Sequence, residues 1–261
     1  MSEYDVHAEF YDALYAGYDV DIPFYVAEAR RAGSPVLELA CGTGRVAIPV
    51  AHAGIEVVGV DSSPAMLERF RERLSDLPPL VRQRISLIEA DMSDFDLGAE
   101  RFNLVYCPFR AFLHLLTVED QLAALQAVHH HLRSGGRFAL NFFSPSVTII
   151  AGSIATFGSP VRRIQEFTHP TTGNKVVVHL TSTHDVVEQI IREYRIEEEI
   201  DAHGRVVQRT YKPLTLRWIY RYEFEHLLAR CGFEVEALYG TFDRQPFAPD
   251  HGELIWIARK R

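Results

Sequence analysis

LELACGTGR, at residues 37–45, joins a short apolar segment to a second apolar segment with helical spacing. Gly42 and Gly44 lie at that junction, one residue apart. Because glycine has no side chain, backbone N–H groups there can approach a bound ligand closely. In an open α/β sheet the ligand lies beyond the carboxyl ends of the strands, next to the first strand. The junction therefore predicts a nucleotide-type site, and the alternative is a tight turn that binds nothing.

The segments around this junction alternate between short apolar runs and helix-like patterns. The run at 62–74 is typical of a helix, because a serine precedes an early proline and apolar residues follow at helical spacing. Such alternation predicts a parallel sheet with helices on both faces. We expect strands at 34–40, 55–61, 84–91, 101–107 and 137–143, and helices within 3–32 and at 45–53, 62–74 and 118–133, the last ended by Gly135 and Gly136.

The pattern changes after the fifth strand. Residues 159–217 alternate with a period of two between turn-like tetrapeptides, which predicts an antiparallel sheet. We therefore expect an α/β core formed by residues 1–144 and 218–261, interrupted by an antiparallel β insertion at 145–217. The closing helix and strands of the core are expected at 220–233, 233–240 and 252–260.

The composition favours a cytoplasmic protein that binds neither nucleic acid nor membrane. The chain has 261 residues, enough for a large core, and its formal charge is −8, whereas nucleic acid requires a basic surface. Cys41, Cys107 and Cys231 are few and far apart, so no disulfide framework is expected. The N-terminus lacks a signal pattern, and no apolar run approaches the roughly 20 residues that cross a bilayer.

Two ligand classes compete for the glycine-rich junction. GTGRVA matches the dinucleotide pattern G-x-G-x-x-G/A, and Asp61 lies at a distance suited to a ribose. The other interpretation uses Glu38, followed by Ala40, Gly42 and Gly44 at alternate positions. This spacing resembles motif I of the class I S-adenosylmethionine-dependent methyltransferases, in which glycine is usual in place of Ala40.

Two aspartates fit the methyltransferase pattern. In that family the acid that ends the second strand, here Asp61 in VVGVDSSPAML, receives both ribose hydroxyls, and a carboxylate can accept two hydrogen bonds. The family places another aspartate after the third strand to accept from the adenine amino group, followed by a backbone contact to the ring. In EADMSDF these are Asp91 and Met92. The resemblance implies S-adenosylmethionine as cofactor and S-adenosylhomocysteine as product, with the cofactor held by Glu38, Ala40, Cys41, Gly42, Gly44, Asp61, Ser62, Met66, Asp91, Met92 and Tyr11.

The resemblance continues to the end of the chain. FEVEALYG and GELIWIARK resemble the family's closing strands, the last of which is inserted antiparallel. The implied fold is α/β: a Rossmann-like seven-stranded methyltransferase sheet with an antiparallel last strand, plus the antiparallel β insertion after the fifth strand. The implied function is methyl transfer to a small-molecule acceptor. Two alternatives stay open: an NAD(P)-dependent oxidoreductase, which does not require the acid at position 91, and a non-catalytic S-adenosylmethionine-binding protein.

The loop after the fourth strand, CPFRAFLHLL, lies beside the sulfonium and the acceptor in this family. Nucleic-acid adenine methyltransferases carry an Asn/Asp-Pro-Pro-aromatic run there, which CPFR does not match. Arg110 is a candidate for holding an acidic group of the substrate, against the alternative of a surface ion pair. His114 is a candidate general base because its pKa suits neutral pH, against the alternative of a packed histidine.

The stretch at 9–25 is rich in tyrosine and resembles the N-terminal lid of small-molecule methyltransferases. Tyr11 is the predicted lid residue, near the sulfonium or the cofactor's carboxylate, since an aromatic face attracts a cation. The alternative is a packing stripe of Tyr4, Tyr11 and Tyr15 at helical spacing.

The placement of the insertion resembles that in the amino-sugar N-methyltransferases and the glycine N-methyltransferase group. In those enzymes the antiparallel sheet roofs the active site and often mediates dimers. The resemblance implies N-methylation ahead of O-methylation, and it suggests a homodimer. The candidates for reading the acceptor, against the alternative of solvated surface, are Glu166, His169, Tyr211, Arg217 and Arg244.

Three consecutive histidines at 129–131 invite a metal interpretation. Neighbouring residues on a helix point about 100° apart, so three in a row cannot converge on one ion. Histidines near a helix end also interact favourably with its dipole. Because no cysteine–histidine cluster has zinc spacing, we expect no metal.

Overall fold

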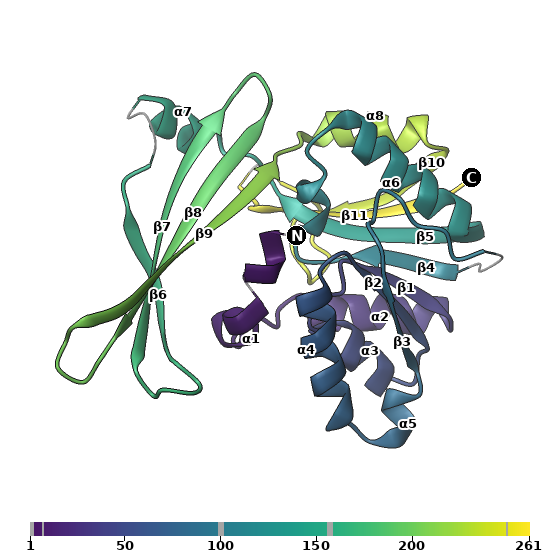
Figure 1. The fold of residues 1–261 in the computed structure, drawn as a ribbon. Helices are drawn as coiled ribbons and strands as arrows, with labels where there is room; N and C mark the ends of the chain where they lie inside the picture. The colour runs from purple at the N-terminus through teal and green to yellow at the C-terminus, as the bar shows by residue number, and fades with distance from the viewer. Residues whose placement is uncertain (1–2, 7, 99–101, 156–158, 249) are drawn as a thin grey trace.

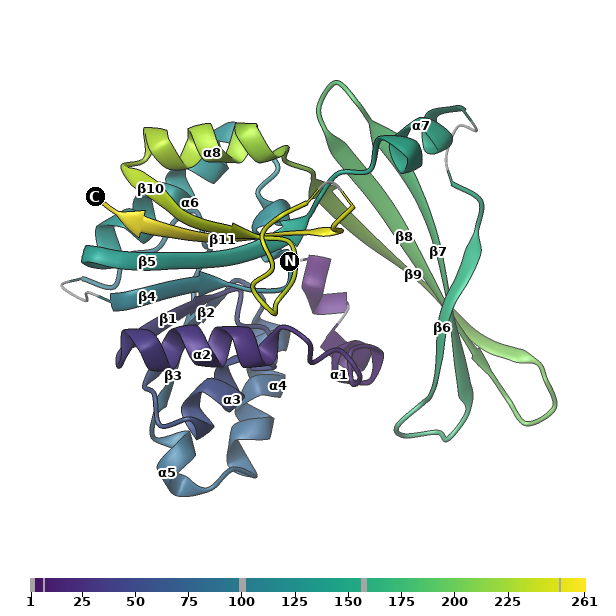
Figure 2. The ribbon, with the colours of Figure 1, turned by 180° about the vertical axis from the view of Figure 1, so that it is seen from behind.

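The computed structural model describes residues 3–6, 8–98, 102–155, 159–248 and 250–261. It contains a seven-stranded sheet and a separate four-stranded sheet. A short helical segment from the N-terminus lies between the two sheets (Figures 1 and 2). No helix among the described residues is long and apolar enough to span a membrane.

The seven-stranded sheet has the strand order β10-β11-β5-β4-β1-β2-β3. β1 pairs in parallel with β2 and β4, whereas β11 runs antiparallel between β5 and β10. This order confirms the predicted Rossmann-like sheet with an antiparallel last strand. The strands are β1 (Val36–Leu39), β2 (Val57–Asp61), β3 (Ile85–Glu89), β4 (Phe102–Cys107), β5 (Leu132–Phe143), β10 (Phe233–Tyr239) and β11 (Glu253–Lys260).

Helices cover both faces of this sheet and bury it between two apolar layers. α2, α3 and α4 pack on one face, and α6 and α8 pack on the other (Figure 1). All four residues of β1 are buried because this central strand meets both layers. The helices are α2 (Ile22–Ala32), α3 (Ala47–His52), α4 (Pro64–Ser75), α5 (Pro79–Arg82), α6 (Val118–His131) and α8 (Arg221–Arg230).

The ends of two helices differ in how well the sequence predicts them. Ser63 is the N-cap of α4, and its Oγ accepts a hydrogen bond from the Met66 N–H at 3.2 Å, as the serine–proline pattern predicts. The prediction that Gly135 and Gly136 end α6 is wrong. That helix ends at His131, because the chain becomes extended at the next residue, and both glycines belong to β5.

The four-stranded antiparallel sheet, called the roof sheet below, is inserted between β5 and α8, in the order β6-β7-β8-β9. Two of its three hairpin turns lie at the predicted positions, near 171–174 and 201–204, whereas the turn between β7 and β8, at 186–189, was not predicted. The expectation that the insertion is entirely β is incomplete, because α7 (Val147–Ala155) is helical and packs on β7. The strands are β6 (Arg162–Thr168), β7 (Lys175–Asp185), β8 (Ile190–Ile200) and β9 (Val206–Arg217).

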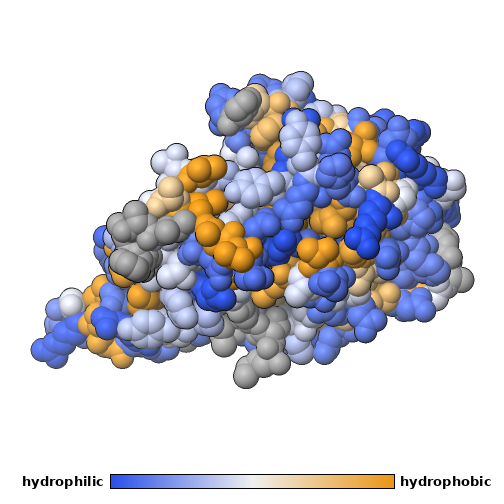
Figure 3. All heavy atoms as spheres, turned by 90° about the horizontal axis from the view of Figure 1, so that it is seen from above, coloured by the Kyte–Doolittle hydropathy of each residue, from blue (hydrophilic) through white to orange (hydrophobic). Residues whose placement is uncertain are grey.

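Several apolar side chains are exposed on the insertion. Val147 and Ile149 of α7 are 68% and 65% exposed, and Tyr211 of β9 is 60% exposed. Figure 3 shows apolar residues on the upper face of the molecule, on the side of the roof sheet. The homodimer stays a prediction.

The N-terminal segment, formed by η1 (Glu3–Val6), η2 (Ala8–Phe10) and α1 (Tyr11–Leu14), bridges the two sheets. On the core side, Asp5 Oδ1 accepts a hydrogen bond from Ser63 Oγ, and Asp12 Oδ1 accepts one from Thr43 Oγ1, each at 2.6 Å. On the other side, the Phe10 ring packs against β6 of the roof sheet. The stretch with the predicted lid residue is thus in place between core and roof.

Candidate active site

A cavity of about 450 Å³ opens where β1, β2, β3 and β4 end. An open α/β sheet places its ligand at this edge. The N-terminal segment and the roof sheet complete the walls. The cavity is lined by Tyr4, Tyr11, Ala40, Gly42, Val60, Asp61, Ser62, Met66, Ala90, Asp91, Met92, Pro108, Phe109, Ala111, His114, Leu115 and Thr215.

The loop between β1 and α3 turns with left-handed backbone. Ala40, Gly42 and Gly44 have φ angles of 53°, 53° and 83°. A Cβ atom on Gly42 would meet nothing within 4 Å, whereas one on Gly44 would overlap the ring of Phe70 in α4. Gly42 therefore leaves space at the cavity wall, and Gly44 lets α4 pack closely.

Asp61, the last residue of β2, holds this loop with both carboxylate oxygens. Oδ2 accepts a hydrogen bond from the Gly42 N–H at 2.7 Å, and Oδ1 accepts one from the Ser63 N–H at 2.8 Å. Burial raises the pKa of Asp61, and these two hydrogen bonds act against that rise. Each carboxylate oxygen has a second lone pair. The side chain can therefore still accept hydrogen bonds from a pair of hydroxyls in the cavity.

Asp91 and Met92 follow β3 and also line the cavity. Asp91 Oδ1 accepts hydrogen bonds from the Ser93 N–H at 2.8 Å and from Ser93 Oγ at 2.6 Å. Oδ2 accepts none from the described part of the chain, and the side chain is exposed to the cavity. The second oxygen is thus available to a ligand amino group.

Three predicted cofactor residues lie behind the wall instead of in it. Glu38, Cys41 and Gly44 do not line the cavity. Glu38 is 1% exposed, and its Oε2 accepts a hydrogen bond from the Tyr106 hydroxyl at 2.8 Å. Burial raises the pKa of Glu38 to about 8, so its carboxyl group is mainly protonated at neutral pH. These residues support the loop from beneath.

Arg45 joins the glycine loop to the start of α2, which the sequence did not reveal. Its two terminal nitrogens donate to the carboxylate of Asp21 at 2.6 and 2.7 Å, and Nη1 also donates to the Tyr18 carbonyl at 3.1 Å. Such bidentate pairs fix geometry well. The guanidinium also lies 4.6 Å from the centroid of the Phe109 ring, in the cavity wall.

Two of the three predicted catalytic residues reach the cavity. Tyr11 and His114 line it together with Tyr4. The Tyr4 hydroxyl lies 2.9 Å from His114 Nε2. Burial raises the pKa of both Tyr4 and Tyr11, so both phenols stay protonated at neutral pH. The rings of Tyr11 and Tyr15 also pack 4.9 Å apart, as the packing alternative predicts.

Arg110 does not line the cavity. Its Nε donates to Glu253 Oε1 at 2.9 Å, and its side chain is 46% exposed. Arg110 therefore forms the surface ion pair that was the alternative interpretation of this residue. The predicted role of Arg110 in holding an acidic group of the substrate gains no support from this position, because Glu253 of β11 pairs with the guanidinium.

Asn141, a fully buried residue of β5, holds the loop after β4. Its Oδ1 accepts hydrogen bonds from the Tyr25 hydroxyl at 2.7 Å and from the Phe109 N–H at 3.0 Å. Phe109 and Arg110 have φ angles of 58° and 65°, a region that costs energy for residues other than glycine. The loop therefore depends on bonds such as these. The available signal was one polar residue inside the apolar run RFALNFF.

Replacing Asn141 by alanine is expected to lower the free energy of unfolding by about 1–3 kcal/mol, because the Tyr25 hydroxyl and the Phe109 N–H lose a buried acceptor. We also expect a lower kcat/KM, since Phe109 lines the cavity. Urea unfolding and steady-state kinetics measure the two effects. Asn103→Ala, at a more exposed position in β4, is the control. Equal stability of the two variants would contradict the proposed role of Asn141.

None of the five residues predicted to read the acceptor lines the cavity. Tyr211 is exposed on the roof sheet. Each of the other four side chains pairs with an acidic or basic residue away from the cavity. The roof sheet instead contributes Thr215 to the wall. The four contacts are Glu166 with Lys175, His169 with Glu199, Arg217 with Glu223 and Arg244 with Glu28.

Of the three consecutive histidines, two approach a common point. Side-chain atoms of Asp96, His130 and His131 lie within 4.8 Å of one another. Both ring nitrogens of His131 are already engaged, with the Leu97 N–H at 2.9 Å and the Ala127 carbonyl at 2.8 Å. A histidine ligand needs a free nitrogen lone pair, so we draw no metal site from this group.

Residues 36–136 match the family described as "Methyltransferase domain". A dTDP-3-amino-3,4,6-trideoxy-alpha-D-glucopyranose N,N-dimethyltransferase from Streptomyces venezuelae is 29% identical, over 69% of this chain and 77% of its own.

Two solved structures are similar over nearly the whole chain. The CcbJ methyltransferase from Streptomyces caelestis has a TM-score of 0.76 and 26% identity, covering 94% of this chain and 91% of its own. The glycopeptide N-methyltransferase MtfA, complexed with S-adenosylmethionine, has a TM-score of 0.57 and 26% identity, covering 94% and 96%.

Proposed function

We propose that this chain, a class I S-adenosylmethionine-dependent methyltransferase, methylates an amine nitrogen of a small-molecule acceptor. The enzyme class and the cofactor rest on the methyltransferase-domain match and on the similar enzymes. Neither the oxidoreductase nor the non-catalytic alternative is retained. The choice of nitrogen is supported by two N-methyltransferases among the similar proteins, one acting on an amino sugar and one on a glycopeptide by their names.

The cavity suits the cofactor where the sequence prediction expects it. Asp61 offers free lone pairs beside a backbone loop that Gly42 leaves open, which suits a ribose diol. Asp91 Oδ2 suits the adenine amino group, with Met92 beside it. We propose that Ser62 and Met66 complete the nucleoside side of the site.

The single observation that carries the proposed methyl transfer is that Tyr4, Tyr11 and His114 lie together on the remaining wall of the cavity. These side chains can orient a neutral amine and accept one proton, and direct methyl transfer needs little else. We also propose that residues 145–217 act as a domain that covers the acceptor side.

When bound, S-adenosylmethionine supplies a methyl group on a sulfonium leaving group, which the lone pair of the acceptor nitrogen displaces. The residues of the chain hold the acceptor in line and exclude water. We propose that His114 takes the proton that the nitrogen loses. Tyr4, whose hydroxyl lies 2.9 Å from His114 Nε2, would fix the orientation of the imidazole ring.

The test pairs each amine with the matching alcohol. The purified protein is incubated with S-adenosylmethionine and with dTDP-linked or free amino sugars, alongside the sugars that carry a hydroxyl in place of the amine. Mass spectrometry then detects added methyl groups. We expect methylated amines and unchanged alcohols.

Methylation of the alcohols alone would overturn the proposed choice of nitrogen and support O-methylation. Calorimetry can also show that the protein binds S-adenosylmethionine and S-adenosylhomocysteine. If it binds both and none of these sugars is methylated, the proposal of an amino-sugar acceptor is weakened and other classes of acceptor must be tried.

A further inference from the structure

β8 of the roof sheet carries one acidic side chain without a partner on its inner face. Glu193 makes no hydrogen bond or ion pair with any described residue, although its side chain is half-buried. Burial raises its pKa, and the guanidinium groups of Arg195, Arg162 and Arg110 act against that rise. A half-buried carboxylate without a partner is costly unless a ligand supplies one.

The direction of Glu193 follows from its neighbours on the same strand. Side chains two residues apart in a strand lie on one face. Ile191 packs in the main apolar core, and the Arg195 guanidinium lies 5.6 Å from the centroid of the Tyr15 ring. Glu193, between them, therefore faces the space between the roof sheet and the core. Its cross-strand partner, Leu214 of β9, packs in the same apolar core as Ile191.

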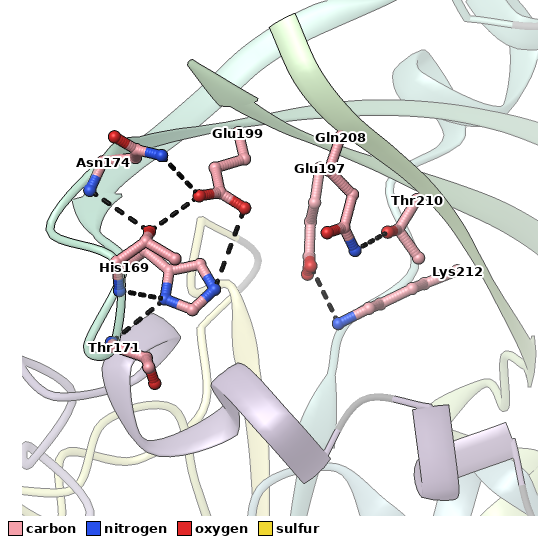
Figure 4. A network of polar contacts seen from close by, with 9 residues as sticks. His169, Thr171, Asn174, Glu197, Glu199, Gln208, Thr210 and Lys212 are labelled. Atoms are coloured by element: carbon pink, nitrogen blue, oxygen red, sulfur yellow. Dashed lines mark hydrogen bonds and ion pairs between the residues drawn. The ribbon is translucent and has the colours of Figure 1, made fainter. Parts of the chain in front are cut away.

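The other inward-facing acids of β8 already have polar partners, as Figure 4 shows. Glu197 Oε2 lies 2.8 Å from Lys212 Nζ, and both side chains are almost fully buried. Glu199 accepts hydrogen bonds from Thr172 and Asn174, each at 2.7 Å. Glu197 and Glu199 lie where the N-terminal segment covers the strand, and each has a polar partner. Glu193 has none among the described residues.

Arg195 next to it has an unused donor. Its Nε atom is buried and makes no hydrogen bond with a described residue. Leu180 of β7 is the cross-strand neighbour of both Arg162 in β6 and Arg195 in β8. The two guanidinium groups therefore lie on the same face of the roof sheet. A short chain of rings connects this face to the cavity, because the Tyr15 ring lies 4.8 Å from the ring of Phe109.

We propose that Glu193 binds the acceptor's amine as the acceptor enters, ahead of the wall of Tyr4, Tyr11 and His114 where methyl transfer takes place, and that Arg195 receives an anionic group of the same acceptor; neither Glu193 nor Arg195 lines the cavity itself. This deepens the proposed function, on which it rests, by naming the substrate class: a small amine that also carries a phosphate or a carboxylate. The acidic and basic partners lie on one strand face, so a single molecule with both groups can contact them together. Glu193 would act as a specificity residue, separate from the His114 and Tyr4 pair.

Binding to the protein saturated with S-adenosylhomocysteine tests this assignment. The probes are glucosamine 6-phosphate, glucosamine and glucose 6-phosphate, measured by ligand-detected NMR. Glu193→Gln keeps the size of the side chain and removes its charge. Glu198→Gln changes an acid of the same strand on the opposite face, which pairs with Arg209, and serves as the control.

We expect wild-type protein to prefer glucosamine 6-phosphate over either single-group probe. Glu193→Gln is expected to lower that affinity about ten- to a hundredfold, as the loss of a charged hydrogen bond does, while Glu198→Gln leaves it unchanged. Affinity for S-adenosylhomocysteine should be equal in all three proteins, and the melting temperature of Glu193→Gln without acceptor should be no lower than that of wild type, because the substitution removes a half-buried charge that has no partner.

Equal binding of glucosamine 6-phosphate by wild type and Glu193→Gln would overturn the assignment, as would no preference of wild type for the amine probes. A preference for free glucosamine over its phosphate would overturn the role given to Arg195. These outcomes are separate from the proposed function, which is decided by whether the wild-type enzyme methylates amines or alcohols. Methylation of amines with an unaffected Glu193→Gln variant would leave that function standing.

Discussion

Replacing Asp61 by alanine is expected to weaken the binding of S-adenosylmethionine about a hundredfold or more, because a charged acceptor for both ribose hydroxyls is lost. The change also removes the partner of two backbone donors, the N–H groups of Gly42 and Ser63. The glycine loop and the start of α4 would therefore lose their common anchor. Isothermal titration with S-adenosylmethionine and S-adenosylhomocysteine measures the effect directly.

Asn at position 61 is expected to rescue little of this loss. Both carboxylate oxygens of Asp61 accept a backbone N–H, whereas an amide offers one oxygen and turns an NH2 group toward the other donor. Asp76→Asn, at the exposed C-terminal end of α4, is the matched control and should bind the cofactor normally. An Asp61→Asn variant with wild-type affinity would show that the ribose does not depend on this carboxylate.

The positions of the two aspartates that we propose bind the cofactor could be predicted, because the strands themselves define these positions. Asp61 ends β2 and Asp91 follows β3, and parallel strands bring these ends to one edge of the sheet. The strand pattern, together with the family resemblance, was therefore sufficient to predict that both carboxylates line one cavity. Pattern could not show that Glu38, although it belongs to the same motif, would turn beneath the loop toward Tyr106.

The acceptor side could not be predicted, because it depends on how the roof sheet faces the core. In IIREYRIEEEI the apolar positions Tyr194 and Ile196 share one face, and Glu193 lies on the other. A hydrophobic pattern alone would direct the apolar face inward. The structure directs the charged face inward, where Lys212 neutralises Glu197.

Because a hydrophobic pattern carries limited information, one helix was not predicted and the end of another was predicted wrongly. α7 is short and apolar, so its run could equally be read as a strand. The glycines after α6 look like a helix end, yet Gly136 lies inside β5, where an added Cβ would come within 2.9 Å of the Arg133 carbonyl oxygen. This glycine marks a close backbone approach within a strand, which the sequence does not distinguish from a helix terminator.

Replacing Gly44 by alanine is expected to lower the free energy of unfolding by about 2–4 kcal/mol and to impair cofactor binding. About 1 kcal/mol comes from holding alanine at a positive φ, since φ is 83° at this position. Overpacking adds about 1–3 kcal/mol, because the new Cβ would overlap the Phe70 ring. Urea unfolding gives the stability, and calorimetry gives the affinity.

Two further glycines separate these contributions. Gly54 has a φ of 92° and nothing within 4 Å of an added Cβ, so Gly54→Ala should show the backbone cost alone. Gly42→Ala also meets no protein atom, but its φ is 53° and it lies in the cavity wall, so it should lose cofactor affinity while its stability falls only by the backbone cost. The order of stabilities should therefore be Gly44→Ala lowest, with the other two variants similar.

A Phe70→Leu background tests the cause of the larger effect. If the ring is what alanine at position 44 strikes, shortening it should reduce the cost of Gly44→Ala toward that of Gly54→Ala, which a double-mutant cycle measures as a coupling energy. Independent effects of the two substitutions would mean that backbone conformation alone demands glycine here. That result would assign the whole cost to the turn and none to the packing of α4 against it.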